Sequence, residues 1–461
     1  MVVHHLVAAA GDGDHGAHRR AAVADLAGRA VLTASLVLLF GFAALLVIGT
    51  PLMVALGLTG TFVLLTNQLG IMALPTNVYA GIAKFPLLAL PMFVLAGLVF
   101  ERAGVAARLV AFATSLVGNR PGGLGIVAII VCMILGGISG SGPADAAAVA
   151  MVMVPAMAAQ GYPKPFSASL IAAAGSTAIL IPPSIAFIVY AVLVPGAAVP
   201  SLFAGGLVPG LLAGLSLILP TLYLARRHGM GGEGRGEAVR PVWETFREAS
   251  WGLMAPVIIL GGLRSGAFTP TEAAVVAAAY GMFVGMAVYR SLSFRALFEV
   301  MIEAAEISAV VMIVIALAGI YAHAGSTLGA FDAFAKWLMA TTQSETAMLL
   351  AITVMILIAG MLLDGVSIFL IFLPILIPIA QAYGWSMVWF GIVLTMNIAI
   401  GQFTPPMAVN LIVTARIAGV TIESTVPWAI WMVGAMLGAL MLVSFVPELA
   451  LFLPRWLGYP V

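Results

Sequence analysis

The stretch ILIPPSIAFIVYA, residues 179–191, contains two adjacent prolines inside a long apolar segment. The surrounding segment, from Pro165 to Ala225, contains no Asp, Glu, Lys or Arg. A run of this kind suits lipid, since about 20 consecutive apolar residues already make a membrane-spanning helix. Proline lacks a backbone donor and obstructs the helix, so the spanning helix should break at Pro182 and Pro183.

The composition of the whole chain also indicates a membrane protein. Of its 461 residues, 63% are hydrophobic and only 8% are charged, whereas about 25% are charged in an ordinary soluble domain. The charge-free runs add up to about ten to twelve transmembrane segments, some of which are re-entrant hairpins. These runs are continuous rather than alternating, which excludes a β-barrel. We predict an all-α integral membrane protein that is surrounded by membrane lipid.

Charge and cysteine content exclude several other classes of function. The 19 basic and 18 acidic residues leave no basic surface for phosphates, so no nucleic-acid partner is expected. The single cysteine, Cys132, lies in an apolar run and can form neither an internal disulfide nor a cysteine-based metal site.

Polar segments divide the chain. Residues 1–29 contain four of the six histidines, and we predict a disordered cytoplasmic tail there. Residues 226–248 form the only extended polar segment of the interior, and its arginines predict a cytoplasmic linker. The linker separates a first half, residues 30–225, from a second half, residues 249–461.

A second proline pair relates the two halves. It lies in GQFTPPMAVNLIVTA, residues 401–415, which is also free of charge on either side of the prolines. One offset of 223 residues relates three pairs of landmarks: Pro155 and Pro378, Gly161-Tyr162 and Gly384-Trp385, and Pro182 and Pro405. Transporters with inverted repeats bind substrate and coupling ion at broken helices near the membrane midplane. We predict that each half contains one hairpin and one broken helix.

Uncharged polar residues surround both breaks: Ser176, Thr177 and Ser184 in the first half, and Asn397, Gln402, Thr404 and Asn410 in the second. Their hydroxyl and amide oxygens suit a hard monovalent cation. The alternative is that they only form hydrogen bonds between helices, which contribute about 0.6 kcal/mol each on average.

Two further polar spots precede the breaks, in GGISGSGPADAAA (residues 136–148) and GMLLDGVS (residues 360–367). Glycine and serine permit an irregular turn at each spot. Asp145 and Asp364 are acids set in apolar sequence, and a carboxylate within a membrane is a candidate for function. Either residue can instead lie at the water boundary of a turn.

An intramembrane protease is an alternative to a transporter. Gly137-Ile138-Ser139-Gly140 matches the G-x-S-G pattern of rhomboid-type intramembrane serine proteases, with His323 as a partner base. That hypothesis leaves the repeat and both proline pairs unexplained. The aspartates also lack the Gly-x-Gly-Asp context of intramembrane aspartyl proteases, so we expect no enzymatic activity.

From about Gly49 to Gly458 the chain resembles the large membrane subunit of TRAP (tripartite ATP-independent periplasmic) transporters. Seven phrases carry the resemblance in the expected order: FPLLALPMFVLAGLVFERAGVAARLV, VGNRPGGL, ISGSGPADAAAV, IPPSIAFIVYA, LFAGGLVPGLL, GAFTPTEAA and GQFTPPMAVNL. The resemblance implies an elevator-type secondary transporter with two inverted repeats, located in the bacterial inner membrane. It also implies Na⁺-driven import of a small organic acid.

The resemblance implies partners and site residues as well. The partners are a soluble extracytoplasmic solute-binding protein and a small four-helix membrane subunit; Na⁺ is the coupling ion and no cofactor is expected. Ion and substrate roles carry over to Ser139, Gly140, Ser141, Ser176, Thr177, Pro182, Asp364, Gly365, Asn397, Gln402, Thr404 and Pro405. A stand-alone elevator symporter for dicarboxylates or citrate is the alternative within transport.

The first repeat departs from the commoner form of the family. A serine is usual where this chain has Gly142, a threonine where it has Asp145, and often a glycine where it has Ala178. Asp145 either adds negative charge that strengthens cation binding or caps the returning helix of the hairpin.

Overall fold

The computed structural model describes residues 33–117, 120–231, 240–342, 344–406 and 408–461. These residues form helices and turns and contain no β-strand, which confirms the predicted all-α class. The tail predicted at residues 1–29 lies outside them. Lipid offers no hydrogen bonds to the backbone, so helices that satisfy their own N–H and C=O groups are what this composition permits.

Seven helices among the described residues are long and apolar enough to cross a membrane: Phe85–Arg102, Gly142–Ala159, Val199–Arg227, Pro270–Val288, Phe294–Leu328, Gly365–Ala382 and Ile422–Phe445. Seven shorter apolar helices accompany them, including Gly123–Ser139, Glu345–Gly360 and Met387–Gly401. Re-entrant hairpins and discontinuous helices consist of such short helices, because each helix ends at a hairpin tip or at a break.

Contacts divide the chain into two compact units. Unit 1 comprises Met1–Ala83, Val310–Gln343 and Leu370–Ile379. Its helices include α3 (Leu52–Thr66), α4 (Ala73–Ile82), α16 (Ala330–Thr341) and the later part of α15 (Phe294–Leu328). Gly60 of α3 lets the backbones approach closely, because a Cβ there would lie 2.9 Å from the amide nitrogen of Tyr321 in α15.

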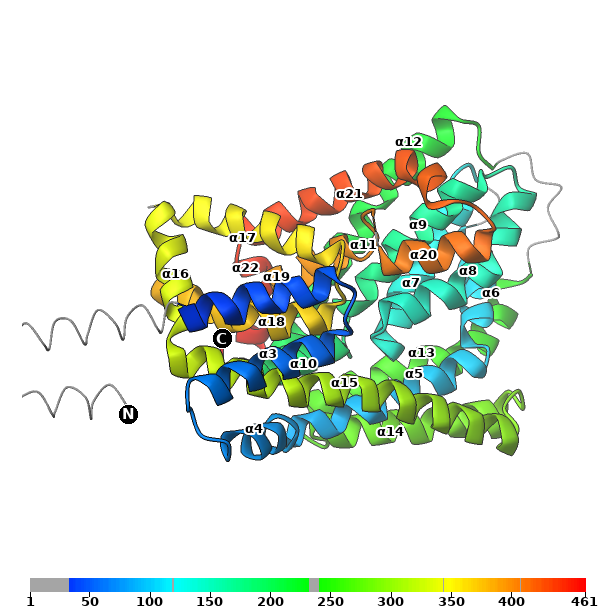
Figure 1. The fold of residues 1–461 in the computed structure, drawn as a ribbon. Helices are drawn as coiled ribbons and strands as arrows, with labels where there is room; N and C mark the ends of the chain where they lie inside the picture. Colours follow the sequence, from blue (N-terminus) through cyan, green and yellow to red (C-terminus); the bar gives the residue numbers. More distant parts are fainter. Residues whose placement is uncertain (1–32, 118–119, 232–239, 343, 407) are drawn as a thin grey trace, which may run out of the picture. The chain divides into compact units, whose positions relative to one another are not determined.

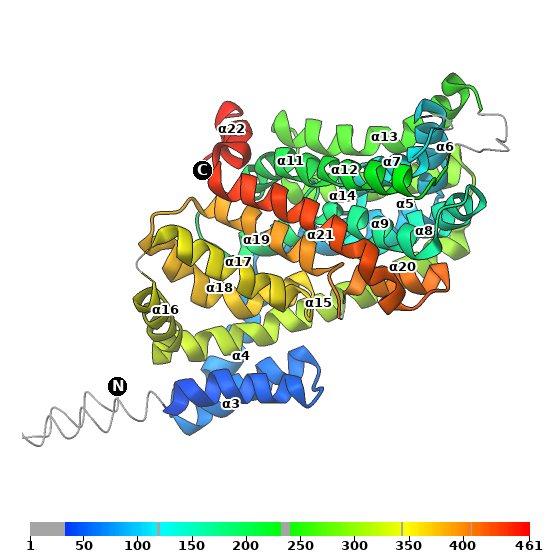
Figure 2. The same ribbon diagram turned by 90° about the horizontal axis from the view of Figure 1, so that it is seen from above.

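Unit 2 comprises Lys84–Ala309, Ser344–Phe369 and Ala380–Val461, and it contains every predicted site residue. Its helices are α5 (Ala89–Arg102), α6 (Val105–Val117), α7 (Gly123–Ser139), α8 (Gly142–Ala159), α9 (Lys164–Ser176), α10 (Ile185–Leu193), α11 (Val199–Ser216), α12 (Ile218–Arg227), α13 (Val242–Arg264), α14 (Pro270–Phe283), α17 (Glu345–Gly360), α19 (Met387–Gly401), α20 (Val409–Ala418), α21 (Ile422–Phe445) and α22 (Glu448–Trp456). Helices α8, α9 and α20 pack side by side (Figures 1 and 2).

The helix bounds follow the repeat found in the sequence. Helix α8 (Gly142–Ala159) and helix α18 (Gly365–Ala382) both contain 18 residues, and their first residues are 223 positions apart. The same offset relates Lys164, the first residue of α9, to Met387, the first residue of α19. A hairpin followed by a broken helix therefore occurs twice.

The equivalent loops of the two repeats lie at opposite ends of α21. The first-repeat loop contains Tyr162, which stacks on Phe166, and Phe166 contacts Trp428 near the beginning of α21. The second-repeat loop contains Trp385, which lines a pocket with Ser444 near the end of α21. Figure 1 shows α21 running from α12 toward α22. Opposite placement of equivalent loops is the mark of an inverted repeat.

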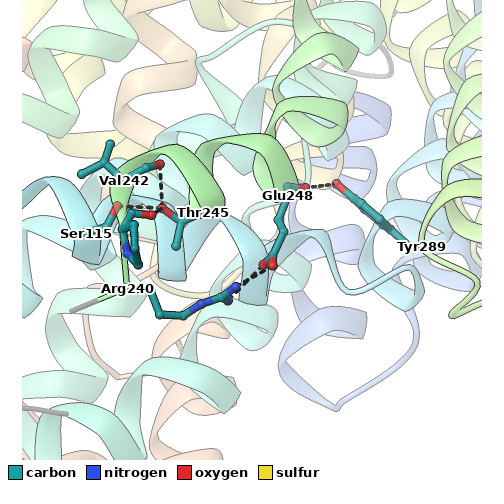
Figure 3. A network of polar contacts seen from close by, with 7 residues as sticks. Ser115, Arg240, Val242, Thr245, Glu248 and Tyr289 are labelled. Carbon is teal, nitrogen blue, oxygen red and sulfur yellow. Dashed lines mark hydrogen bonds and ion pairs between the residues drawn. The ribbon is translucent and has the colours of Figure 1, made fainter. Parts of the chain in front are cut away.

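Charged and polar contacts hold the beginning of helix α13. Helix α12 ends at Arg227 and α13 begins at Val242, while residues 232–239 lie outside the described residues. The Arg240 guanidinium donates to both carboxylate oxygens of Glu248, at 3.0 and 2.6 Å, and the Tyr289 hydroxyl donates to the Glu248 carbonyl at 2.7 Å (Figure 3). These contacts fix the polar start of α13.

Candidate functional site

The tip of the first hairpin joins α7 to α8. Helix α7 ends at Ser139, and Gly140 adopts the left-handed conformation with a φ of 62°. A Cβ at Gly140 would lie only 2.3 Å from the carbonyl oxygen of Pro183. Glycine is therefore required by both the conformation and the contact, and it seats the tip directly on the first proline pair.

Ser139 and Asp145 form a buried polar pair behind this tip. The Ser139 hydroxyl donates to Asp145 Oδ1 at 2.6 Å, and the Ser141 amide donates to the Ser139 hydroxyl at 3.2 Å. The side chains of Ser139 and Asp145 are 8% and 4% exposed. Asp145 lies in the first turn of α8, but its hydrogen-bond partner, Ser139, is the last residue of α7. The pair thus fixes the geometry of the turn.

The first break separates α9 from α10. After α9 the chain makes one 3₁₀ turn, Thr177–Ile179, and then passes through the cis Pro182-Pro183 bond. Ser176 and Thr177 donate to the carbonyls of Ala173 and Ala174, both at 2.7 Å. These hydroxyl oxygens retain lone pairs that can still accept or coordinate.

Ser184 restarts the helix after the first break. Its hydroxyl donates to the Ile179 carbonyl at 2.5 Å and accepts from the Phe187 amide at 3.3 Å. Ser184 is therefore the N-cap of α10, a role that serine favours. The sequence placed this serine near the break, and the structure gives it a local capping function.

The tip of the second hairpin joins α17 to α18 at Asp364. Its carboxylate accepts from the amides of Val366 and Ser367, at 3.0 and 3.1 Å, and from the Ser367 hydroxyl. Asp364 is exposed and acts as the N-cap of α18, where a negative charge also favours the helix dipole. It differs from Asp145, which is buried.

The second break separates α19 from α20. Gln402 through Pro406 are not helical, and the Pro405-Pro406 bond is cis. Thr404 donates to the Ile400 carbonyl at 2.6 Å, and Asn397 donates to the Val393 carbonyl at 3.2 Å. Both side chains thus bond back to their own helix and leave oxygen lone pairs free.

Helix α17 rests directly on the end of α19. A Cβ at Gly401 would lie 2.5 Å from the Gly360 backbone, so the two glycines allow backbone-to-backbone contact. Small residues at such contacts are a common device of membrane helix packing. The second hairpin therefore contacts the second break through glycine, as the first hairpin contacts the first break through Gly140.

Gln402 reaches both hairpins. Its Oε1 lies 3.0 Å from the position that a Cβ of Gly142 would occupy, and its Nε2 lies 3.8 Å from the corresponding position at Gly365. Asn410 lies on the same side of Gly142, with its Nδ2 3.2 Å from that position and donating to the Ala172 carbonyl at 3.3 Å. The second break thus contacts the hairpin of the first repeat as well as its own.

Several buried oxygen atoms at these sites lack a hydrogen-bond partner among the described residues: Asp145 Oδ2, Asn397 Oδ1, Gln402 Oε1 and Asn410 Oδ1. A buried polar atom without a partner is rare in folded proteins, so these oxygens are candidate ligand atoms. All four atoms are acceptors. Helices α9 and α19 also end here, and a helix C-terminus carries partial negative charge. The arrangement favours cations.

The predicted site residues fall into two groups in space. The first hairpin tip, with Ser139, Gly140 and Ser141, meets the first proline pair where Gly140 contacts Pro183, and the second tip meets the second break where Gly365 lies near Gln402. The groups meet at Gly142, which sequence reasoning noted only as a departure from a commoner serine. Asn410 is among the polar residues whose oxygens suit a cation, but it is not one of the residues that the resemblance implies. Its burial, at 0% exposure, could not be read from a chain that is apolar throughout.

Comparison with known proteins places the chain in a transporter family. The family described as "Tripartite ATP-independent periplasmic transporter, DctM component" matches residues 39–449. The chain is 37% identical over 441 residues to the C4-dicarboxylate TRAP transporter large permease protein DctM of Rhodobacter capsulatus, covering 92% of this chain and 100% of that one.

A longer relative is similar over most of this chain. The isethionate TRAP transporter permease protein DctMQ of Oleidesulfovibrio alaskensis is 38% identical over 416 residues, which are 90% of this chain. The match spans only 65% of that relative's own length.

The solved structure of the Alcanivorax borkumensis YdaH transporter resembles this chain in fold. The two share a TM-score of 0.58 and 16% identity, with 82% of this chain and 90% of the other covered. At that identity the likeness bears on the fold alone.

Proposed function

Since the chain belongs to the DctM component family of tripartite ATP-independent periplasmic transporters, and is thus their large membrane permease, we propose that it imports a small organic acid together with Na⁺. Its relatives are named as permeases rather than enzymes. The rhomboid hypothesis gains no support from Ser139, because its hydroxyl donates to Asp145.

The observation that carries the Na⁺ proposal is the set of buried acceptors without a partner at the second break. Asn397 Oδ1 and Gln402 Oε1 have no hydrogen-bond partner among the described residues, and both lie near the end of α19. Na⁺ prefers uncharged oxygen ligands of this kind. We propose one Na⁺ site at each break, formed by hydroxyl, amide and carbonyl oxygens on the repeat's own hairpin and broken helix.

The proposed substrate site lies between the hairpins, around Gly142 and Gln402. Helix α8 begins at Gly142, and its N-cap Ser141 makes no capping hydrogen bond through its side chain. Free amides at a helix N-terminus favour an anion. The names of two relatives specify isethionate and C4-dicarboxylates, so we propose a small carboxylate or a similarly compact organic anion.

We propose the two partners that the family's tripartite description implies. One is a small membrane subunit; the longer DctMQ relative, whose length exceeds the match, is consistent with such a subunit fused to the permease. The other is an extracytoplasmic solute-binding protein. Arginines at residues 226–248 favour a cytoplasmic location for that segment in an inner membrane.

Reconstituted uptake tests the proposal. The full chain and its small subunit are inserted into liposomes, and labelled succinate or isethionate is supplied on the loaded binding protein. The proposal predicts accumulation that requires an inward Na⁺ gradient and the binding protein. Equal uptake with choline outside would refute Na⁺ coupling, and uptake of free solute at the same rate would favour the stand-alone symporter.

A further inference from the structure

A pocket lies in unit 2, at the end of α21 opposite the end that contacts α12. Its volume is about 460 Å³, within the range of roughly 300–1,000 Å³ that is usual for small-ligand sites. It is lined by the beginning of α17, the loop before α19 and the ends of α21 and α22. None of the residues carried into the transport proposal lines it.

The pocket contains a buried hydroxyl without a partner. Ser444 is 4% exposed, and its Oγ makes no hydrogen bond to any other described residue. Trp389, whose indole N–H donates to the Val443 carbonyl at 3.0 Å, fixes the backbone next to Ser444. Ser444 therefore lines the pocket with a hydroxyl whose hydrogen-bonding capacity is unused.

Charge distinguishes between possible ligands. Glu345 lines the pocket and accepts from the Trp385 indole N–H at 2.7 Å, but no basic side chain of the described residues pairs with it. Arg455 also lines the pocket, and Glu448 already pairs with it. A simple anion is therefore repelled by the surplus carboxylate. A ligand with an ammonium group is favoured at Glu345, and a phosphate next to that ammonium can approach Arg455 beside its partner Glu448.

The surface near the pocket is apolar and exposed. Phe445, Phe452 and Trp456 are 52%, 61% and 72% exposed. In a membrane protein such side chains contact acyl chains, and tryptophan is enriched where headgroups lie. Trp385 and Trp389 also line the pocket, and aromatic side chains attract ammonium groups. A ligand with a zwitterionic head and apolar tails fits these features together.

We propose that this pocket binds the headgroup of phosphatidylethanolamine. Its primary ammonium donates to Glu345 and to Ser444 Oγ, its phosphate lies toward Arg455, and its acyl chains follow Phe452 and Trp456. Such a lipid joins α17 to α21 and α22. The proposal concerns a lipid site and does not depend on the solute or on Na⁺.

Lipid-dependent unfolding tests this site. The full chain in detergent micelles is heated with equal mole fractions of dioleoyl phosphatidylethanolamine, phosphatidylcholine or phosphatidylglycerol, without Na⁺ or solute. Phosphatidylcholine shares the phosphate but has no N–H donor, and phosphatidylglycerol has no ammonium. Phosphatidylethanolamine should raise the unfolding midpoint most, and native mass spectrometry should retain about one such lipid per chain. Equal shifts from the first two lipids would overturn the proposal.

Variants locate the effect in the pocket. Glu345→Gln should abolish the preference for phosphatidylethanolamine over phosphatidylcholine, whereas Arg455→Gln should weaken both lipids alike. Glu423→Gln, an exposed acid in the first turn of α21 at the other end, should leave the preference intact. Loss of the preference in Glu423→Gln would contradict the site. A full shift with soluble glycerophosphoethanolamine would show that the ligand is a free headgroup compound instead of a lipid.

Discussion

At the scale of single residues, the two aspartates that the sequence treats alike have different surroundings. Asp145 is buried and bonds to Ser139 across the first hairpin, whereas Asp364 is exposed and caps α18. Both lie in Gly- and Ser-containing turns within apolar sequence, so their spacing could not separate them. The difference arises because Asp145 lies three residues inside its helix and Asp364 lies before its helix.

Asp364→Asn separates capping from ion binding. Asparagine caps helices as well as aspartate does, so the unfolding midpoint should change little, while Na⁺-driven uptake should fall because the negative charge is lost. Asp364→Ala should also destabilise the protein, by about 0.5–2 kcal/mol. Uptake by Asp364→Asn equal to that of the wild type would show that Asp364 acts as a cap alone.

A double-mutant cycle tests the Ser139–Asp145 pair. Replacing Asp145 with Ala leaves the buried Ser139 hydroxyl without its acceptor, which should destabilise the protein by about 1–3 kcal/mol. Adding Ser139→Ala should restore part of that loss, with a coupling energy of about 0.5–3 kcal/mol. Additive effects of the two changes on thermal unfolding would mean that the pair contributes no coupling.

At the scale of elements, glycines decide how hairpins meet breaks. Gly140 meets the carbonyl of Pro183, and Gly360 meets the backbone of Gly401. The proline pairs and their offset of 223 residues predicted two breaks and two hairpins from sequence. The same patterns could not predict that Gln402 of the second repeat would contact the first hairpin, because a contact between repeats depends on how the repeats pack.

Gly401→Ala tests the contact between the second hairpin and α19. The added Cβ would lie 2.5 Å from the Gly360 backbone, and overpacking of this kind costs about 1–3 kcal/mol. The unfolding midpoint should fall. Gly434→Ala is the matched control, since a Cβ there meets nothing within 4 Å and Ala suits a helix better. Equal effects of the two substitutions would refute the close contact.

The ion pair that holds the beginning of α13 predicts a small pH dependence. The Arg240 guanidinium holds the pKa of the Glu248 carboxyl below its usual range. This stabilisation is present above the unfolded carboxyl pKa, about 4.3, and is lost as pH falls through the lower folded value. Because both side chains are about half exposed, the effect should be small.

Comparing the unfolding midpoints of the wild type and Arg240→Gln between pH 7 and pH 3 checks this dependence. The difference between the two proteins should shrink as the pH falls. A difference that is constant over the whole range would exclude the pair as its source.

At the scale of the whole molecule, the composition predicted a membrane protein and the repeat predicted its internal symmetry. Both follow from physical constraints that act on long stretches of chain: the solvation of side chains by lipid and the need for each backbone donor to find a partner. The division of the chain into two compact units could not be predicted from the sequence. Unit 1 includes Leu370–Ile379, from within α18, although unit 2 contains the rest of that helix. Such an assignment depends on packing between distant segments.

The sequence of this chain does not specify its substrate. Gln402, Asn410 and Gly142 meet at one place, but none of these residues distinguishes one small organic acid from another. A relative named for isethionate and one named for C4-dicarboxylates are 38% and 37% identical to this chain. Nearly equal identity to both is what we expect if much of the selection belongs to the solute-binding protein.

Na⁺-dependent thermal unfolding of the purified full chain tests the proposed coupling ion without requiring a substrate. The midpoint is measured in NaCl and in choline chloride at equal ionic strength, for the wild type, Thr404→Ala and Thr395→Ala. Thr395 is the matched control, since it is buried and donates to the Gly391 carbonyl at 2.7 Å as Thr404 does to Ile400 at 2.6 Å, but it lies within α19.

An ion at about 100 times its dissociation constant stabilises the folded state by about 2.7 kcal/mol. We expect Na⁺ to raise the unfolding midpoint of the wild type and of Thr395→Ala, and to leave that of Thr404→Ala unchanged. The same midpoint for the wild type in both salts, or a rise that persists in Thr404→Ala, would contradict a Na⁺ site at the second break.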